Sequence, residues 1–289
     1  MNRIITAAIA LPVLIASIIF PPLKWLFVVI GSAAIVVALY EFWFLSKRVG
    51  ARPDVVVGYA ATAALLVTFI FNWDALTVLY LVVIVPLLVI AALVAEMLRG
   101  APFDKMILSV GSTVLGVLYV ALLGGHMIAI RTGFEQVYAE PGTYLVGAAY
   151  VGKTLSTHLL AFFFLVLMGS DTGAYYTGRL LGKHKLAPSV SPGKTWEGAF
   201  GGMAASLLAA ALAHFWFFPE LALSAALPLA AVMNVLGVVG DLTESALKRG
   251  SNAKDAAQIL PGHGGLLDRL DSLLFNAPLI YYFALYYWR

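Results

Sequence analysis

The chain has 289 residues, of which 62% are hydrophobic and only 11% charged, whereas a soluble domain has roughly 25% charged residues. This composition excludes a soluble globular protein. The formal net charge of +3 is small, and Lys and Arg are not spread along a soluble face, which argues against nucleic-acid binding. The absence of cysteine excludes a disulfide, a thiolate nucleophile and a cysteine-ligated zinc ion.

The apolar residues form runs long enough to cross a hydrocarbon core about 30 Å thick, which takes about 20 helical residues. We therefore expect an all-α, polytopic integral membrane protein with about nine transmembrane helices. The predicted spans cover residues 4–20, 25–45, 55–71, 75–98, 106–130, 155–180, 197–218, 222–247 and 266–288. The first span follows Arg3 as in a signal peptide, but Pro21-Pro22 replaces a cleavage site, so we expect a retained helix.

The basic residues divide unequally between the two sides of the membrane. Nine spans place the N-terminus on the same side as the loops after the even-numbered spans. That side carries 14 of the 18 Lys and Arg residues, so the positive-inside rule assigns it to the cytoplasm. We expect the chain to lie in the cell inner (plasma) membrane. We predict N-terminal helices in residues 1–130, about five spans, and a catalytic region in 131–289 with cytoplasmic loops at 181–197 and 248–266.

Several polar or small residues within the spans have structural interpretations. Glu41 and Glu96 lie near cytoplasmic helix ends, where a snorkelling carboxylate or a packing role is favoured over chemistry. His126 is expected to be a packing histidine whose hydrogen bonds are satisfied. A run of small residues indicates close helix packing: Gly198, Gly201, Gly202, Ala204 and Ala205.

Charged residues return in two segments, 170–202 and 240–272, both predicted to be cytoplasmic. In the first, Asp171 lies within or just after an apolar stretch, where an unpaired carboxylate costs several kcal/mol. We therefore expect a positive partner for it, such as Arg179, a lysine or a cation.

The same segment contains Ser191-Pro192-Gly193-Lys194-Thr195, which resembles a tight turn that opens the next helix. Free backbone N–H groups at a helix start, together with Lys194 and the Thr195 hydroxyl, would bind a phosphate group. The alternative is that Ser191 or Thr195 only caps the helix and that Lys194 follows the positive-inside rule.

The second segment is denser in charge. Asp241, Ser245 and Lys248 are spaced i, i+4 and i+7, which puts them on one helix face, and Asp268 and Asp271 are spaced i, i+3. Carboxylates without cysteine suit Mg²⁺, which takes one or two of them and leaves its other positions to water and substrate phosphates.

The glycine-rich turn at 261–265 lies between these acids and permits close backbone approach to a ligand. The neighbouring lysines and arginines would neutralise phosphates. An ion-paired loop is the alternative, although it does not account for charges at membrane depth beside such a turn.

The residues from Ser245 to Asp271 resemble the signature of phosphatidate cytidylyltransferases, also called CDP-diacylglycerol synthases. The match includes Ser245-Ala-Leu-Lys248-Arg249 and Leu260-Pro-Gly-His263-Gly-Gly-Leu-Leu-Asp268-Arg269-Leu-Asp271, with every spacing kept. Gly240-Asp241-Leu242, Ser170-Asp171-Thr172 and the 191–198 segment are similar to further blocks of that family. The resemblance covers about the last 120 residues.

The resemblance implies transfer of CMP from CTP to phosphatidic acid, which gives CDP-diacylglycerol and pyrophosphate for phospholipid synthesis. From the residues and the resemblance together, we expect catalytic roles for Asp241, Lys248, Arg249, His263, Asp268 and Asp271. Substrate contacts are expected from Asp171, Lys194, Thr195, Ser245, Lys254 and Arg269. Asp241 and Asp268 are the expected Mg²⁺ ligands. A second, monovalent cation such as K⁺ and a homodimer are left open.

Two other functions remain in view. A CTP-dependent polyisoprenol kinase would attach the γ-phosphate to an alcohol and release CDP, so analysis of the products separates the two enzymes. A transporter or lipid scramblase is supported by the many helices and by two prolines within spans, Pro12 and Pro86. Transporters place polar groups near the bilayer midplane, whereas the acids here cluster at one face.

Overall fold

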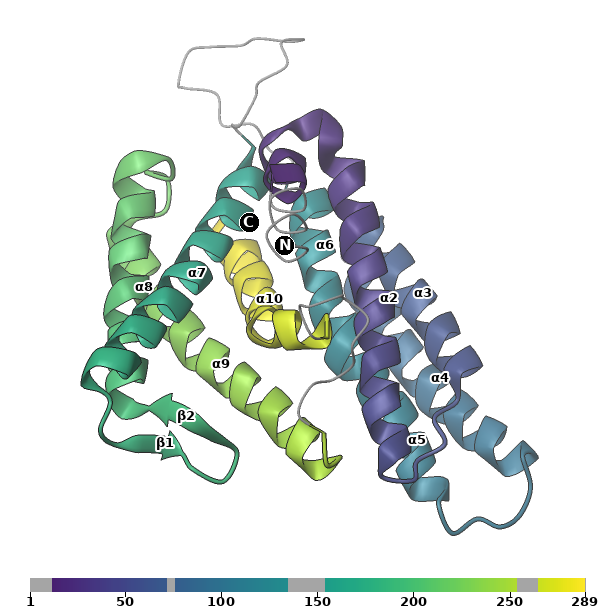
Figure 1. Ribbon diagram of the computed structural model, residues 1–289. Coiled ribbons are helices and arrows are strands. Elements are labelled where there is room, and N and C mark those ends of the chain that lie inside the picture. Colours follow the sequence, from purple (N-terminus) through teal and green to yellow (C-terminus); the bar gives the residue numbers. More distant parts are fainter. Residues whose placement is uncertain (1–11, 72–75, 135–153, 254–264, 289) are drawn as a thin grey trace. The chain divides into compact units, whose positions relative to one another are not determined.

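The computed structural model describes residues 12–71, 76–134, 154–253 and 265–288, and the described residues form nine α-helices and one β-hairpin (Figure 1). The chain divides into two compact units. Unit 1 comprises Met1–Glu135 and Leu247–Leu270, and unit 2 comprises Gln136–Ala246 and Asp271–Arg289.

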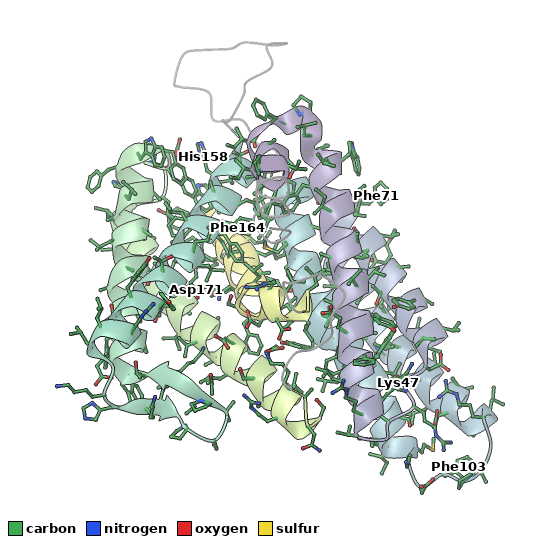
Figure 2. The ribbon with its side chains drawn as sticks, in the orientation of Figure 1. Lys47, Phe71, Phe103, His158, Phe164 and Asp171 are labelled. Atoms are coloured by element: carbon green, nitrogen blue, oxygen red, sulfur yellow. The ribbon has the colours of Figure 1, made fainter. Side chains whose placement is uncertain are left out.

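Unit 1 is a helical bundle. Its helical elements are η1 (Pro21–Leu23), α2 (Lys24–Arg48), α3 (Val55–Ile70), α4 (Leu76–Leu98), α5 (Met106–Gly116), the π-helical η2 (Val117–Leu122) and α6 (Leu123–Gly133). Helix α2 packs against α6, and α3 packs against both α4 and α6. Figure 2 shows Lys47 and Phe103 at one end of this bundle and Phe71 at the other.

Two glycines let large aromatic rings lie directly against helix backbones in unit 1. A Cβ atom on Gly58 would lie 2.3 Å from the ring of Trp43, and one on Gly125 would lie 2.2 Å from the ring of Phe69. Both rings are fully buried. These contacts fix the spacing between α2, α3 and α6 because a methyl group at either glycine would displace a ring.

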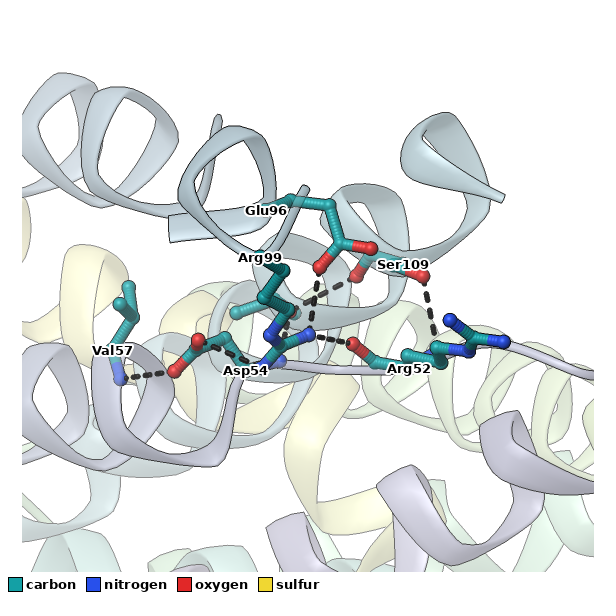
Figure 3. A network of polar contacts seen from close by, with 7 residues as sticks. Arg52, Asp54, Val57, Glu96, Arg99 and Ser109 are labelled. Atoms are coloured by element: carbon teal, nitrogen blue, oxygen red, sulfur yellow. Dashed lines mark hydrogen bonds and ion pairs between the residues drawn. The ribbon is translucent and has the colours of Figure 1, made fainter. Parts of the chain in front are cut away.

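A polar network joins the loops at one end of unit 1 (Figure 3). Asp54 begins α3 by accepting the N–H of Val57 at 2.9 Å, and its second carboxylate oxygen pairs with Arg99 at 2.8 Å. Arg99 also pairs with Glu96 at 2.7 Å and donates to the carbonyl of Arg52 at 2.7 Å. One guanidinium thus ties the end of α4 to the loop before α3.

Unit 2 contains the hairpin and most of the remaining helices. Its elements are α7 (Leu155–Leu181), β1 (Lys185–Ala187), β2 (Ser191–Thr195), α8 (Trp196–Trp216), α9 (Leu223–Gly250) and α10 (Leu267–Trp288). The last residues of α9 and the first of α10 belong to unit 1. The strands are antiparallel, with Lys185 opposite Thr195 and Ala187 opposite Ser191.

Small residues bring α7 and α8 into close contact, as the sequence predicted. A Cβ atom on Gly173 would lie 2.5 Å from the Cβ of Ala205 and 2.7 Å from the carbonyl oxygen of Gly201. A Cβ atom on Gly201 would in turn lie 2.2 Å from the hydroxyl of Thr177. The backbones of the two helices therefore nearly touch, which is how small residues stabilise helix pairs in membranes.

Six described helices are long and apolar enough to cross a membrane: Pro21–Arg48, Leu79–Leu98, Met106–Gly133, Leu155–Leu181, Trp196–Trp216 and Leu223–Gly250. Helix α3 is apolar but shorter. The prediction of an all-α, polytopic integral membrane protein is confirmed. Its count of nine spans was approximate: the first predicted span lies partly outside the described residues, α3 is shorter, and α10 is not among the six. The division of the chain at residue 130 stays a prediction.

Candidate active site

Four elements of unit 2 bring three carboxylates and one lysine together. Asp171 lies on α7 (labelled in Figure 2), Lys194 on β2, Asp241 on α9 and Asp271 in the first turns of α10. The Lys194 ammonium lies 2.6 Å from a carboxylate oxygen of Asp241, with 23% and 41% of the two side chains exposed. Asp171 and Asp271 each interact electrostatically with both members of this pair. The cluster therefore contains more carboxylates than lysines, and its Lys194–Asp241 pair is partly exposed.

Close helix contacts hold these acids in place. A Cβ atom on Gly240 would lie 2.5 Å from the carbonyl oxygen of Asp271, so α9 and α10 approach closely beside Asp241. The buried Asn234 of α9 donates to the hydroxyl of Ser170 at 2.6 Å, immediately before Asp171. Sequence reasoning missed this amide because nothing local identifies the partner of a single Asn within an apolar helix.

The segment from Ser191 to Thr195 is a β-strand, so its prediction as a tight turn was wrong. The turn lies at 188–190, and pairing with β1 extends the later residues. Thr195 caps α8, since its hydroxyl accepts the N–H of Gly198 at 3.1 Å and only 6% of the residue is exposed. The capping alternative therefore holds for Thr195, and a substrate contact through it stays a prediction.

One further site residue lies beside Asp241, and the partner expected for Asp171 can be checked. Ser245, one turn along α9, directs its hydroxyl toward Asp241 at 3.4 Å, as the i, i+4 spacing predicted. Of the positive groups suggested for Asp171, Lys194 attracts its carboxylate electrostatically, and a cation as its partner stays a prediction. Arg179, the other suggested partner, donates instead to the hydroxyl of Tyr175 at 3.0 Å.

A second acid–lysine pair lies in unit 1. The Lys248 ammonium is 2.5 Å from one carboxylate oxygen of Asp268, and 16% of each side chain is exposed. The other oxygen of Asp268 accepts the N–H of Gly265 at 2.9 Å, which holds the end of the glycine-rich segment against the first turn of α10. Arg249 and Arg269, which directly follow Lys248 and Asp268 in the sequence, are both exposed.

Glu41 contributes to the same region of unit 1, although the sequence argument left it out of the site. Its carboxylate accepts the N–H of Leu266 at 3.0 Å and that of Leu267 at 2.7 Å. The side chain has no exposed surface, so it does not snorkel to water. Its carboxylate instead binds two backbone N–H groups. The only sequence signal was an acid within a span, which does not identify a partner 225 residues away.

The structural interpretations of Glu96 and His126 are confirmed. Glu96 pairs with Arg99 and has 12% of its side chain exposed. His126 is buried, with Nδ1 2.8 Å from the carbonyl oxygen of Leu122 and its ring packed against Phe69. Neither residue lies among the candidate site residues.

The metal prediction is neither confirmed nor contradicted. Within the described ranges, no group of three or more His, Cys, Asp or Glu side chains is arranged to hold an ion. Asp241 belongs to unit 2 and Asp268 to unit 1. Lys254 and His263 lie outside the described residues. Carboxylate oxygens beside lysines are nevertheless the donor set that suits Mg²⁺ and phosphate together.

The apolar helices define an integral membrane protein, and the acid–lysine pairs give it two polar clusters. A family model described as the cytidylyltransferase family matches residues 1–287, so the chain belongs to that family.

Among its relatives, the phosphatidate cytidylyltransferase of Staphylococcus saprophyticus is 44% identical over 137 residues, which are 47% of this chain and 53% of the relative. That of Haemophilus influenzae is 45% identical over 129 residues, 43% and 45% of the two chains. That of Bacillus subtilis is 36% identical over 180 residues, 58% and 66% of the two chains. The chain spans about half the length of the first relatives, and the family resemblance found in the sequence is confirmed.

Proposed function

We propose that the protein transfers CMP from CTP to phosphatidic acid, with release of pyrophosphate. The observation that carries this proposal is the family match over residues 1–287, with relatives named phosphatidate cytidylyltransferase. The acid–lysine clusters support it, because carboxylates suit a divalent cation and ammonium groups suit phosphates, and a reaction between phosphates needs both.

The chemistry suits such a site. A phosphate oxygen of phosphatidic acid attacks the α-phosphorus of CTP, a new P–O bond forms, and the bond to the β-phosphate oxygen breaks. Both substrates are anionic and repel each other, so the protein must hold them together and stabilise the charge of an in-line transition state. The nucleophile belongs to the lipid, which makes a covalent enzyme intermediate and a cysteine unnecessary.

The basic residues would bind the phosphates of CTP and the lipid: Lys194, Lys248, Arg249, Lys254 and Arg269. Asp241 and Asp268 would hold Mg²⁺, which when bound neutralises charge on the triphosphate. Asp171 and Asp271 would contribute as outer ligands. Ser245, Thr195 and His263 would position substrate, and K⁺ as a second cation and a homodimer belong to this proposal as untested parts.

The lipid would reach the site sideways from the bilayer, since only its headgroup must leave the hydrocarbon. We place the site at the cytoplasmic face of the plasma membrane, where CTP is available. The 14 basic residues on the predicted cytoplasmic side support this orientation.

The test is a labelling experiment with the full chain purified in detergent and supplied with phosphatidic acid and Mg²⁺. Label on the α-phosphate of CTP should enter the lipid, and label on the γ-phosphate should leave as pyrophosphate. Lipid that carries the γ label would overturn the proposal in favour of a kinase. If neither label entered the lipid, a reaction between CTP and the lipid would be excluded.

A further inference from the structure

Glu41 is a buried acid that binds the backbone of a distant segment. It lies in the last third of α2, which runs from Lys24 to Arg48, and has no exposed surface. Its two carboxylate oxygens accept separate N–H groups, from Leu266 at 3.0 Å and from Leu267 at 2.7 Å. Leu267 is the first residue of α10, so Glu41 contacts the start of that helix.

The position matches a physical need of α10. The first N–H groups of a helix have no acceptor within the helix, and the helix dipole favours a negative charge there. Buried N–H groups without partners would cost free energy, as would a buried carboxylate without donors. Glu41 and the start of α10 satisfy each other, and the helix is capped by a residue from another helix.

The turn that Glu41 holds also carries Asp268. The N–H of Gly265 is donated to Asp268 at 2.9 Å, and the N–H of Arg269 is donated to the carbonyl oxygen of Leu266 at 2.9 Å. Asp268 pairs through its other oxygen with Lys248 at 2.5 Å. Asp268 therefore binds the turn through a residue of the turn itself, and Glu41 binds it through a side chain from α2.

We infer that Glu41 is a positioning residue, which sets the location of Asp268 and Lys248 by anchoring the N–H groups of Leu266 and Leu267. The inference that this anchoring supports turnover rests on the proposed function, whereas the anchoring is a property of the fold and can be measured separately.

The central variant is Glu41→Gln. Gln has nearly the shape of Glu, but it offers one acceptor oxygen and directs an NH₂ group at the second backbone N–H. Glu96→Gln is the control, because Glu96 is another acid of unit 1, with 12% of its side chain exposed and Arg99 as its partner. Glu41→Asp keeps both acceptor oxygens on a shorter arm and should restore part of the lost function.

The first measurement is hydrogen exchange at residues 265–268 in the full chain in detergent. Exchange at Leu266 and Leu267 should be on the order of tenfold to hundredfold faster in Glu41→Gln than in wild type, and unchanged in Glu96→Gln. Equal exchange in wild type and Glu41→Gln would overturn the inference. If Glu41→Gln does not fold, as judged by its elution volume, the same comparison with Glu41→Asp decides.

The second measurement is turnover of CTP and phosphatidic acid. Glu41→Gln should lower kcat about tenfold or more with little change in KM for either substrate, and Glu41→Asp should recover part of it. Faster exchange with unchanged kcat would overturn the positioning role and leave the proposed function intact. If wild type turned over neither substrate, the proposed function would fail, and the exchange result would still decide whether Glu41 anchors α10.

Discussion

Replacement of Asp241 by Asn separates catalysis from folding. The change removes one negative charge but keeps the size of the side chain and an acceptor for Ser245. Lys194 loses its partner at 2.6 Å, but 41% of Asp241 is exposed, so this pair contributes about 1 kcal/mol or less. The repulsion of Asp241 with Asp171 and Asp271 disappears at the same time and offsets part of this loss. The free energy of unfolding should therefore change by less than about 1 kcal/mol.

Turnover should respond far more strongly. If Asp241 helps to neutralise the transition state, its loss should raise the barrier by roughly 3 kcal/mol, on the order of a hundredfold in rate. The assay follows α-labelled CMP into lipid across a Mg²⁺ titration, together with the thermal midpoint. Asp54→Asn is the control, because it weakens the acid–base pair that Asp54 forms with Arg99 in unit 1. Near-normal turnover at limiting Mg²⁺, or lost turnover with a collapsed midpoint, would refute the reasoning.

Three further predictions concern the fold. Tags in the loops near residues 50, 102, 187 and 257 should be cytoplasmic in an accessibility assay, and a tag near 257 on the other side would contradict the proposed access to CTP. Gly173→Ala should destabilise the protein by about 1–3 kcal/mol, because the new methyl group meets the Gly201 backbone, whereas Gly111→Ala enters open space and should leave the thermal midpoint unchanged or higher. Arg99→Met should lower the thermal midpoint, because it breaks two contacts with acids, each contributing about 1 kcal/mol or less. The kcat should stay unchanged, and a loss of turnover in the folded variant would mean that the network has a catalytic role.

The helices could be predicted from the sequence because their signals are local. Apolar runs gave bounds within a few residues, as for the span expected at 155–180 and found at Leu155–Leu181. The small residues after Gly198 indicated close packing, and they pack against α7. The i, i+4 spacing placed Ser245 beside Asp241. Each inference needed only neighbours along one helix.

The parts that the sequence did not predict depend on distant partners. The strand from Ser191 to Thr195 forms because β1 pairs with it, and the segment alone resembles a turn. The acceptor of Leu266 and Leu267 lies on α2, and no periodicity connects the two segments. Glu41 therefore looked like one more acid at a helix end, and only its complete burial identifies a different role.

The two acid–lysine pairs constrain how an anionic substrate could bind. Lys194 is neutralised by Asp241 in unit 2, and Lys248 by Asp268 in unit 1. An ammonium group that is already paired gains little from a phosphate unless its carboxylate finds another positive partner. On the proposed function, Asp241 and Asp268 would hold Mg²⁺, and the lysine paired with each acid would then be available to a phosphate. Nucleotide binding and cation binding would then depend on each other, because the lysines and the cation compete for the same two carboxylates.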